Sequence, residues 1–275
     1  MAGFGPLIQA DRVERELSAP DLRVVDVRWY LDGRSGREAY LSGHIPGAVF
    51  CDLDRDLSAP TGPGRHPLPE RSNFESAMRR LGVGSRTRVV AYDDAGGSVA
   101  ARLWWLLRAY GHPSVAVLDG GIQAWEGPLE RTPATPPPGD FRALELDRSR
   151  VVDYDAVRGR APETVLMDAR AGSRFRGEVE PVDPKAGHIP GAINAYWQEN
   201  LRGDGRFKRS EDLRSLYEGL GVRTGADVVV YCGSGVTSCH DLVVLELAGL
   251  PGARLYPGSW SDWASRGDAP VATGG

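Results

Sequence analysis

An internal repeat limits the folds open to this chain of 275 residues. Gly43-His-Ile-Pro-Gly-Ala-Val49 returns as Gly187-His-Ile-Pro-Gly-Ala-Ile193, a shift of 144 positions (187 − 43). Two short apolar segments that end in Asp-x-Arg, Leu22–Arg28 and Val165–Arg170, repeat in the same order. A period of this length is far too long for a solenoid. The sequence therefore predicts one fold that occurs twice in tandem.

In each half, short apolar segments alternate with segments of helical periodicity. Arg88–Tyr92 and Val228–Tyr231 are strand candidates, and Ser98–Tyr110 is a helix candidate. Such alternation is typical of an α/β fold, in which helices cover both faces of an open parallel sheet. A proline-rich stretch between the halves favours an extended chain outside either core. We therefore predict an N-terminal domain over residues 1–127, a linker over 128–145 and a C-terminal domain over 146–275.

Composition argues against several classes of function. With a net charge of −4, the chain lacks the basic excess of a nucleic-acid-binding protein. It has no basic leader and no run of about eighteen apolar residues, so we expect a cytosolic protein without a membrane partner. Cys51, Cys232 and Cys239 are too few and too unevenly spaced for a disulfide scaffold or a zinc site. We expect no metal and no organic cofactor.

Cys232 lies where a predicted strand meets a predicted helix. It is followed by Gly233-Ser-Gly235, and then by the apolar run Val236–Leu247 with helical spacing. The two glycines allow positive φ angles, so that loop amides turn inward at the positive end of a helix. Such surroundings favour the thiolate and predict a nucleophilic cysteine. The alternative is a buried core cysteine that ends a strand, which would not require a glycine-rich loop.

The first half lacks this nucleophile. Alignment of Tyr92 with Tyr231 puts Asp93 at the position of Cys232. Ligands of open α/β sheets bind where strands end and helices begin, which is where Cys232 falls. We therefore expect the second half to carry the chemistry, and the first half to wall the site and contribute side chains to it.

The paired Asp-x-Arg segments, the duplicated Gly-His-Ile-Pro-Gly-Ala motif and the loop Cys232–Ser238 together resemble the tandem rhodanese-fold sulfurtransferases over essentially the whole chain. In that family, thiosulfate sulfurtransferases usually carry basic residues after the cysteine, whereas 3-mercaptopyruvate sulfurtransferases carry Gly-Ser-Gly-Val-Thr. The loop is similar to that of the second branch. The neutral residues of this loop agree with the 3-mercaptopyruvate branch, because the thiosulfate dianion would gain from cationic side chains beside the sulfur.

The resemblance implies covalent sulfur transfer in two half-reactions. The Cys232 thiolate would take sulfur from 3-mercaptopyruvate as a persulfide, and a thiol or cyanide would then remove it. The expected acceptor is a small thiol or a thioredoxin-like protein. Backbone amides of the loop would stabilise the anionic sulfur in both states. They belong to Gly233, Ser234, Gly235, Val236, Thr237 and Ser238.

Three residues match the serine, histidine and aspartate that work together in the mercaptopyruvate branch: Ser234, His66 and Asp54. In that arrangement His66 would pass a proton through Ser234, and Asp54 would orient the imidazole. His66 lies in the loop Thr61–Pro69, however, where a solvated surface histidine is the alternative.

Arg174 matches the family arginine that binds the substrate carboxylate, and its alternative is a surface arginine among neighbours. The branch usually has a second substrate arginine nine residues further on, where this chain has Asp183. Lys185 is a candidate substitute with a less directional contact. Asp168 matches a family position near the catalytic loop, where we expect it to fix the geometry of the loop or of an arginine.

Three other functions are alternatives to transfer of sulfur from 3-mercaptopyruvate. A thiosulfate sulfurtransferase that uses cyanide as acceptor would share every residue named. A non-enzymatic persulfide carrier is disfavoured by the intact Cys232. A cysteine phosphatase needs an arginine six residues after the cysteine to clamp the phosphoryl group, and position 238 is serine.

Overall fold

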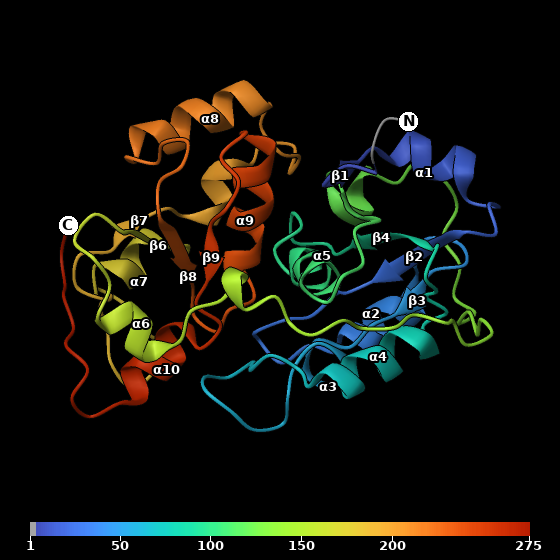
Figure 1. Ribbon diagram of the computed structural model, residues 1–275. Coiled ribbons are helices and arrows are strands. Elements are labelled where there is room, and N and C mark those ends of the chain that lie inside the picture. The colour runs from blue at the N-terminus through green and yellow to red at the C-terminus, as the bar shows by residue number, and fades with distance from the viewer. Residues whose placement is uncertain (1–3) are drawn as a thin grey trace. The chain divides into compact units, whose positions relative to one another are not determined.

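A computed structural model describes residues 4–275 and divides the chain into two compact units (Figure 1). Both are α/β in class, as the repeat predicts. Each unit also contains a short segment from the opposite half of the sequence. The first unit comprises Met1–Ala59, Pro69–Leu146 and Gly203–Phe207, and the second comprises Pro60–Leu68, Asp147–Arg202 and Lys208–Gly275.

The first unit is built on a five-stranded parallel sheet with the order β1-β5-β4-β2-β3. Its strands are β1 (Leu7–Ile8), β2 (Leu22–Asp26), β3 (Val49–Phe50), β4 (Arg88–Tyr92) and β5 (Val115–Leu118). The central strands are almost wholly buried, as parallel strands covered on both faces must be. Figure 1 shows helices on either side of this sheet. They are α1 (Ala10–Glu16), α2 (Gly36–Ser42), α3 (Leu53–Asp56), α4 (Arg71–Arg80), α5 (Ala100–Ala109) and the short η1 (Gly121–Ala124).

The second unit repeats this plan on a four-stranded parallel sheet with the order β7-β6-β8-β9. Its strands are β6 (Val165–Asp168), β7 (Ile193–Asn194), β8 (Val228–Tyr231) and β9 (Arg254–Leu255). Its helices are α6 (Tyr154–Arg158), α7 (Gly172–Phe175), α8 (Ser210–Gly219), α9 (Ser238–Leu247) and α10 (Ser259–Ser265), with the short η2 (Arg148–Arg150) and η3 (Trp197–Asn200). The core below β8 is aromatic and includes Tyr231, Trp260 and Trp263.

The repeated Asp-x-Arg motif forms the same buried ion pair in both units. In each, the arginine donates to the aspartate two residues before it, with shortest N–O distances of 2.6 Å and 2.7 Å. The same guanidinium donates to the carbonyl of the first glycine in the Gly-His-Ile-Pro-Gly-Ala motif. One side chain therefore joins the two repeated motifs within each unit. The residues are Asp26, Arg28 and Gly43 in the first unit, and Asp168, Arg170 and Gly187 in the second.

The proline-rich segment 128–145 contains no helix or strand, apart from one bridge between Glu130 and His44. Near its end the chain is held against the first unit. Phe141 is buried there, with its ring edge-on to those of Phe74 and His112. The three domain boundaries proposed from the sequence stay predictions.

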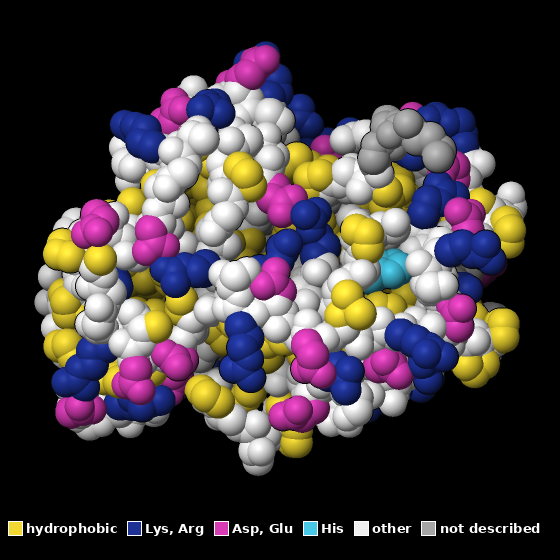
Figure 2. All heavy atoms as spheres, viewed as in Figure 1, with side chains coloured by type: hydrophobic (Ala, Val, Ile, Leu, Met, Phe, Trp, Pro, Cys, Tyr) yellow, Lys and Arg dark blue, Asp and Glu magenta, His cyan; other side chains and the backbone are white. Residues whose placement is uncertain are grey.

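Across residues 4–275, no helix combines the length and the apolar character that crossing a membrane requires. Figure 2 shows basic and acidic side chains interspersed over the visible face. That face has no extended field of one sign.

In the first unit, the loop after β4 corresponds to the loop Cys232–Ser238 of the second unit, here called the cysteine loop. The loop after β4 binds its own carboxylate. Asp93 follows β4 and is fully buried. Its Oδ1 accepts hydrogen bonds from the backbone N–H groups of Ala95 and Gly97, and its Oδ2 accepts from those of Val99 and Ala100. All four distances are 2.8 or 2.9 Å. The aspartate therefore fills the place that an external anion would take in such a loop.

We expect Asp93→Ala to destabilise the first unit by about 3 kcal/mol, because four N–H groups lose their acceptor and three of these hydrogen bonds are buried. Urea unfolding measures the change, and added formate should restore part of it by replacing the lost carboxylate. Asp32→Ala, which removes an exposed carboxylate paired with Arg34, is the matched control and should leave the midpoint unchanged. Equal midpoints for the two variants would contradict this account of Asp93.

Candidate active site

The beginning of α10 fixes the backbone of the cysteine loop. The N–H group of Cys232 donates to Ser259 Oγ at 3.1 Å, and its carbonyl accepts from the N–H group of Trp260 at 3.0 Å. The next carbonyl, that of Gly233, accepts from the N–H group of Ser261 at 2.9 Å. The Cys232 side chain follows β8 directly and is only 3% exposed. Its position is therefore set by main-chain bonds on both sides of the residue.

The glycine at position 235 is required by both conformation and space. Gly235 has a φ of +77°, and a Cβ atom there would lie 2.4 Å from the carbonyl oxygen of Pro257. Its own carbonyl accepts a weak hydrogen bond from Cys239 Sγ at 3.5 Å. Cys239 is fully buried on α9, so this second thiol packs beneath the loop.

Ser259 is held in a strained conformation beside the nucleophile. Its φ of 53° is the only positive value for a non-glycine residue in the described part of the chain. The hydroxyl accepts from the Cys232 N–H group and donates to the carbonyl of Tyr256 at 2.9 Å. Such strain persists where surrounding contacts enforce it, and it is common at functional sites.

His66 belongs to the segment Pro60–Leu68, which packs in the second unit. Its Nδ1 forms a hydrogen bond of 2.7 Å with Ser234 Oγ. His66 is 5% exposed, so it is a buried residue and not a solvated one. The segment packs tightly at Gly64, where a Cβ atom would lie 2.4 Å from the carbonyl oxygen of Gly258.

Asp54 lies in the first unit, on α3. Its carboxylate accepts a hydrogen bond from Trp29 Nε1 at 3.0 Å, and its N–H group donates to Asp52 Oδ1. Ser234 and His66 are thus together, while the part of Asp54 in a triad stays a prediction.

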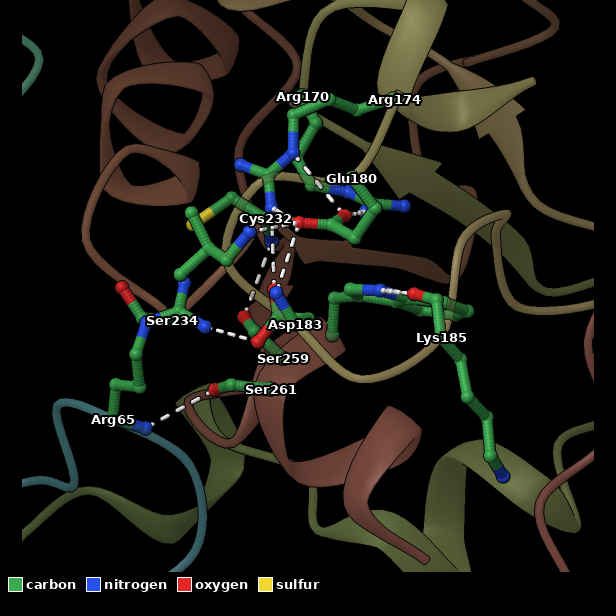
Figure 3. A network of polar contacts seen from close by, with 12 residues as sticks. Arg65, Arg170, Arg174, Glu180, Asp183, Lys185, Cys232, Ser234, Ser259 and Ser261 are labelled. Carbon is green, nitrogen blue, oxygen red and sulfur yellow. Dashed lines mark hydrogen bonds and ion pairs between the residues drawn. The ribbon is translucent and has the colours of Figure 1, made fainter. Parts of the chain in front are cut away.

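A chain of charged side chains lies beside Cys232 (Figure 3). Arg174 contacts Glu180 at 2.6 Å and Asp183 at 3.2 Å. Asp183 also forms an ion pair with Arg65, so one carboxylate lies between two guanidinium groups. Burial raises the pKa of Asp183, although both arginines oppose the shift. Burial acts on Glu180 in the same direction, but the Arg174 guanidinium and two backbone N–H groups outweigh it and lower the pKa of that carboxyl.

Both guanidinium groups lie over Gly233. Its ideal Cβ position is 2.9 Å from Arg65 Nη2 and 3.6 Å from Arg174 Nη1. Any larger residue there would contact these arginines, so the glycine leaves room for them next to Cys232. Arg65 was missed by the sequence analysis. Asp183 was the one signal in the sequence that pointed to Arg65. The family has an arginine at this position, and a buried aspartate in its place requires a nearby cation.

Lys185 is not part of the group of charged side chains over Gly233. Its Nζ donates to the carbonyl of Arg266 at 2.6 Å, and in Figure 3 the side chain points away from Cys232. The structure therefore does not bring Lys185 to Arg174, the residue it was expected to assist. Asp183 instead connects Arg174 to a cation from another segment, Arg65.

Asp168 ends β6 and is fully buried. Both of its carboxylate oxygens accept from Arg170, which also contacts Glu180 at 3.2 Å. Although burial opposes it, the charge of Asp168 raises the pKa of Arg170. Glu180 in turn binds Arg174, so Asp168 is connected through two further side chains to the arginine expected to bind the substrate.

The site combines a thiol, a hydroxyl–imidazole pair and two guanidinium groups. Within residues 4–275, no three His, Cys, Asp or Glu side chains are grouped as a metal site. A cysteine next to cationic groups suits attack on the sulfur of an anionic molecule. The imidazole and hydroxyl suit transfer of one proton during that attack.

Comparison with known proteins identifies the class. The rhodanese-like domain family matches residues 9–128 and again residues 154–266. The chain therefore belongs to the rhodanese family, as a member with two domains in tandem.

The relatives extend over the full length of the chain. A "Probable 3-mercaptopyruvate sulfurtransferase" of Pseudomonas aeruginosa is 46% identical and covers 98% of each chain. The "Putative thiosulfate sulfurtransferase SseB" of Mycobacterium tuberculosis is 42% identical over 98% of this chain and 97% of its own. The crystal structure of SseA from Escherichia coli, a 3-mercaptopyruvate sulfurtransferase, is 34% identical with a TM-score of 0.83, over 94% of this chain and 99% of that one. The protein is thus a sulfurtransferase of the branch that contains SseA.

We expect Ser259→Ala to lower stability by about 2 kcal/mol and to slow sulfur transfer, because the buried Cys232 N–H group loses its acceptor. Ser259→Gly removes the same hydroxyl but suits the positive φ, so it should be more stable than Ser259→Ala and equally slow. Urea unfolding and initial rates measure the two effects. Ser265→Ala, on the same helix, removes a hydroxyl bound only to the Asp262 carbonyl and is the control. Full activity of the glycine variant would exclude a role for the hydroxyl.

Proposed function

We propose that the protein transfers sulfur from 3-mercaptopyruvate to a thiol through a persulfide on Cys232. The observation that carries this proposal is the 2.7 Å hydrogen bond between His66 and Ser234, two residues after the nucleophile. This donor requires a proton transfer, because the carbon that loses sulfur must gain a proton, and a hydroxyl–imidazole pair is suited to supply it. The Pseudomonas and Escherichia relatives named for this activity support the same choice.

In the first half-reaction, the Cys232 thiolate attacks the sulfur of the donor. The new S–S bond forms as the C–S bond breaks, and the electron pair passes to carbon as the enolate of pyruvate. His66 delivers a proton to that carbon through Ser234, which completes pyruvate. Arg174 holds the donor carboxylate as a planar, bidentate partner. The loop N–H groups from Gly233 to Ser238 stabilise the anionic sulfur.

In the second half-reaction, an acceptor thiolate attacks the outer sulfur of the persulfide. The S–S bond to Cys232 breaks, and Cys232 leaves as the thiolate that the loop already stabilises. A small thiol or a thioredoxin-like protein supplies the acceptor thiolate. Cyanide serves in the same role and leaves as thiocyanate.

Thiosulfate is the second candidate donor. It is supported by the Mycobacterium relative and by the two guanidinium groups over Gly233, which would offset much of its double charge. In this case the thiolate takes the outer sulfur, and sulfite leaves without needing a proton. A persulfide carrier that uses neither donor directly is the remaining alternative.

Brief exposure to 3-mercaptopyruvate should add one sulfur atom to the intact protein, as measured by mass spectrometry. Cys232→Ser should remain unmodified, because the other two thiols, Cys51 and Cys239, are fully buried. Cys239→Ser is the matched control and should load normally. Loading only by thiosulfate would favour the second donor, and loading by neither would favour the carrier.

His66→Ala and Ser234→Ala should each lower kcat with 3-mercaptopyruvate about 100-fold, the usual scale of a lost proton transfer. Turnover of thiosulfate should change far less, because sulfite leaves without a proton. The two donors thus serve as each other's control in one folded variant. Equal losses with both donors would mean that the pair supports the loop and moves no proton.

A further inference from the structure

One residue of α10 contacts the backbone next to both members of the proposed proton relay. The N–H group of Ser261 donates to the carbonyl of Gly233 at 2.9 Å, and Gly233 directly precedes Ser234. The hydroxyl oxygen of Ser261 accepts from the N–H group of Arg65 at 3.1 Å, and Arg65 directly precedes His66 (Figure 3). Ser261 therefore holds the residue before each partner of the hydrogen-bonded pair.

The segment that carries the imidazole depends on contacts of this kind. Residues Pro60–Leu68, here called the histidine segment, form neither a helix nor a strand. Regular secondary structure therefore does not set the position of His66. A hydrogen bond weakens steeply as its distance and angle depart from the ideal, so a small shift of this segment would weaken the 2.7 Å contact between His66 and Ser234.

The internal repeat supplies a comparison for Ser261. The turn and helix at Gly258–Trp263 correspond to Gly120–Trp125 in the first unit, at a shift of 138 positions (263 − 125). Ser261 is thereby matched by Gln123. The side chain of Gln123 donates to the carbonyl of Asp94 at 2.8 Å, in the loop after β4 of its own unit. In the unit without a nucleophile, the side chain at this position therefore holds its own loop.

The backbone contacts of the two units agree with this correspondence. The N–H group of Ile122 donates to the Asp93 carbonyl at 2.9 Å, as that of Trp260 donates to the Cys232 carbonyl at 3.0 Å. In the second unit, the main chain of Ser261 holds the next carbonyl of the cysteine loop, and its hydroxyl oxygen accepts instead from the histidine segment. The side-chain contact is thus specific to the unit that carries the nucleophile.

We propose that Ser261 is a positioning residue, which keeps the imidazole of His66 at hydrogen-bond distance from Ser234 by holding the N–H group of Arg65. It acts through the backbone and takes no part in the chemical step itself. The effect on turnover rests on the proposed function, in which His66 delivers a proton through Ser234. The effect on the placement of His66 does not.

Ser261→Ala isolates this contact, because the turn before α10 keeps its main-chain hydrogen bonds. The Gly233 carbonyl retains its N–H donor. The Gly258 carbonyl loses the hydroxyl that donates to it at 3.1 Å, but it still accepts from the N–H group of Asp262 at 3.0 Å. The cysteine loop should therefore stay in place while the histidine segment loosens.

The first test measures the placement of His66 and requires no sulfur transfer. Diethyl pyrocarbonate acylates accessible imidazoles, and peptide mass spectrometry locates the modified histidine. His66 is 5% exposed and should react slowly in the parent protein. It should react about five times faster in Ser261→Ala, which is the scale of one net hydrogen bond. Ser265→Ala removes a hydroxyl from the same helix and is the matched control, with an unchanged rate.

The second test asks whether this placement matters for proton transfer. Ser261→Ala should lower kcat with 3-mercaptopyruvate about tenfold, because a misplaced imidazole delivers its proton slowly. Turnover of thiosulfate, and alkylation of Cys232 by iodoacetamide, should change little. In a protein that already carries His66→Ala, the same substitution should cause no further loss, since the group that it positions is absent.

A second variant disturbs the contact from the other side. Gly64 has a φ of +77°, and a Cβ atom there would lie 2.9 Å from Ser261 Oγ and 2.4 Å from the Gly258 carbonyl oxygen. Gly64→Ala should push the histidine segment away from α10 and reproduce the loss that is selective for 3-mercaptopyruvate. Gly225 has a similar φ of +80° with nothing within 4 Å of its ideal Cβ position, so Gly225→Ala is the control for backbone strain.

The outcomes separate the inference from the function. Parent turnover of 3-mercaptopyruvate by His66→Ala would reject the proposed relay, and faster acylation of His66 in Ser261→Ala would still support the positioning role. Unchanged acylation in Ser261→Ala would overturn the inference. Parent turnover by Ser261→Ala, where His66→Ala is slow, would also overturn it. Equal losses with both donors, together with slower alkylation of Cys232, would mean that Ser261 supports the cysteine loop instead.

Discussion

The geometry of the site depends on the buried ion pair between Asp168 and Arg170. Its guanidinium donates to the Gly187 carbonyl, contacts Glu180 and lies 4.7 Å from the ring centre of Trp260. The backbone N–H group of Trp260 in turn donates to the Cys232 carbonyl. Removing one member of such a pair leaves an uncompensated buried charge, at a cost of about 3–5 kcal/mol. The ion pair therefore connects the end of β6, the repeated histidine motif and the cysteine loop, so the site forms only when this part of the core is intact.

The first unit contains the same ion pair without the chemistry, and this contrast separates what the fold needs from what the reaction needs. In both units a loop follows the end of a buried central strand, β4 or β8. In the first, Asp93 supplies the anion permanently. In the second, Cys232 occupies that position, and the loop is held from α10 by Ser259 and the residues after it. A thiol in such a loop can accept and release a sulfur atom. A carboxylate instead satisfies the N–H groups of the loop and cannot carry sulfur.

The repeat and the alternation of apolar segments were enough to predict the fold, because both patterns can be read from the order of residues without knowing any long-range contact. Two-residue strands such as β3, β7 and β9 could not be predicted, since periodicity needs at least four residues to be visible. Arg65 escaped prediction for a different reason. It is 118 positions from its partner Asp183, and a single sequence does not reveal a contact over that separation. Lys185 is two positions from Asp183 in the sequence, but its ammonium group donates to the carbonyl of Arg266 instead.

The neutral residues that follow Cys232 favour 3-mercaptopyruvate over thiosulfate as the donor. Those residues describe only the charges on the loop itself. The structure adds Arg65 and Arg174, whose guanidinium groups lie over Gly233 although neither belongs to the loop. Because interaction between charges depends on distance and burial and not on sequence position, the field at the sulfur is set by these arginines together with Asp183. A neutral loop therefore does not by itself exclude a doubly charged donor. The proposed proton relay from His66 to Ser234 is then the stronger discriminator, since only one of the two donors requires a proton at the atom that loses sulfur.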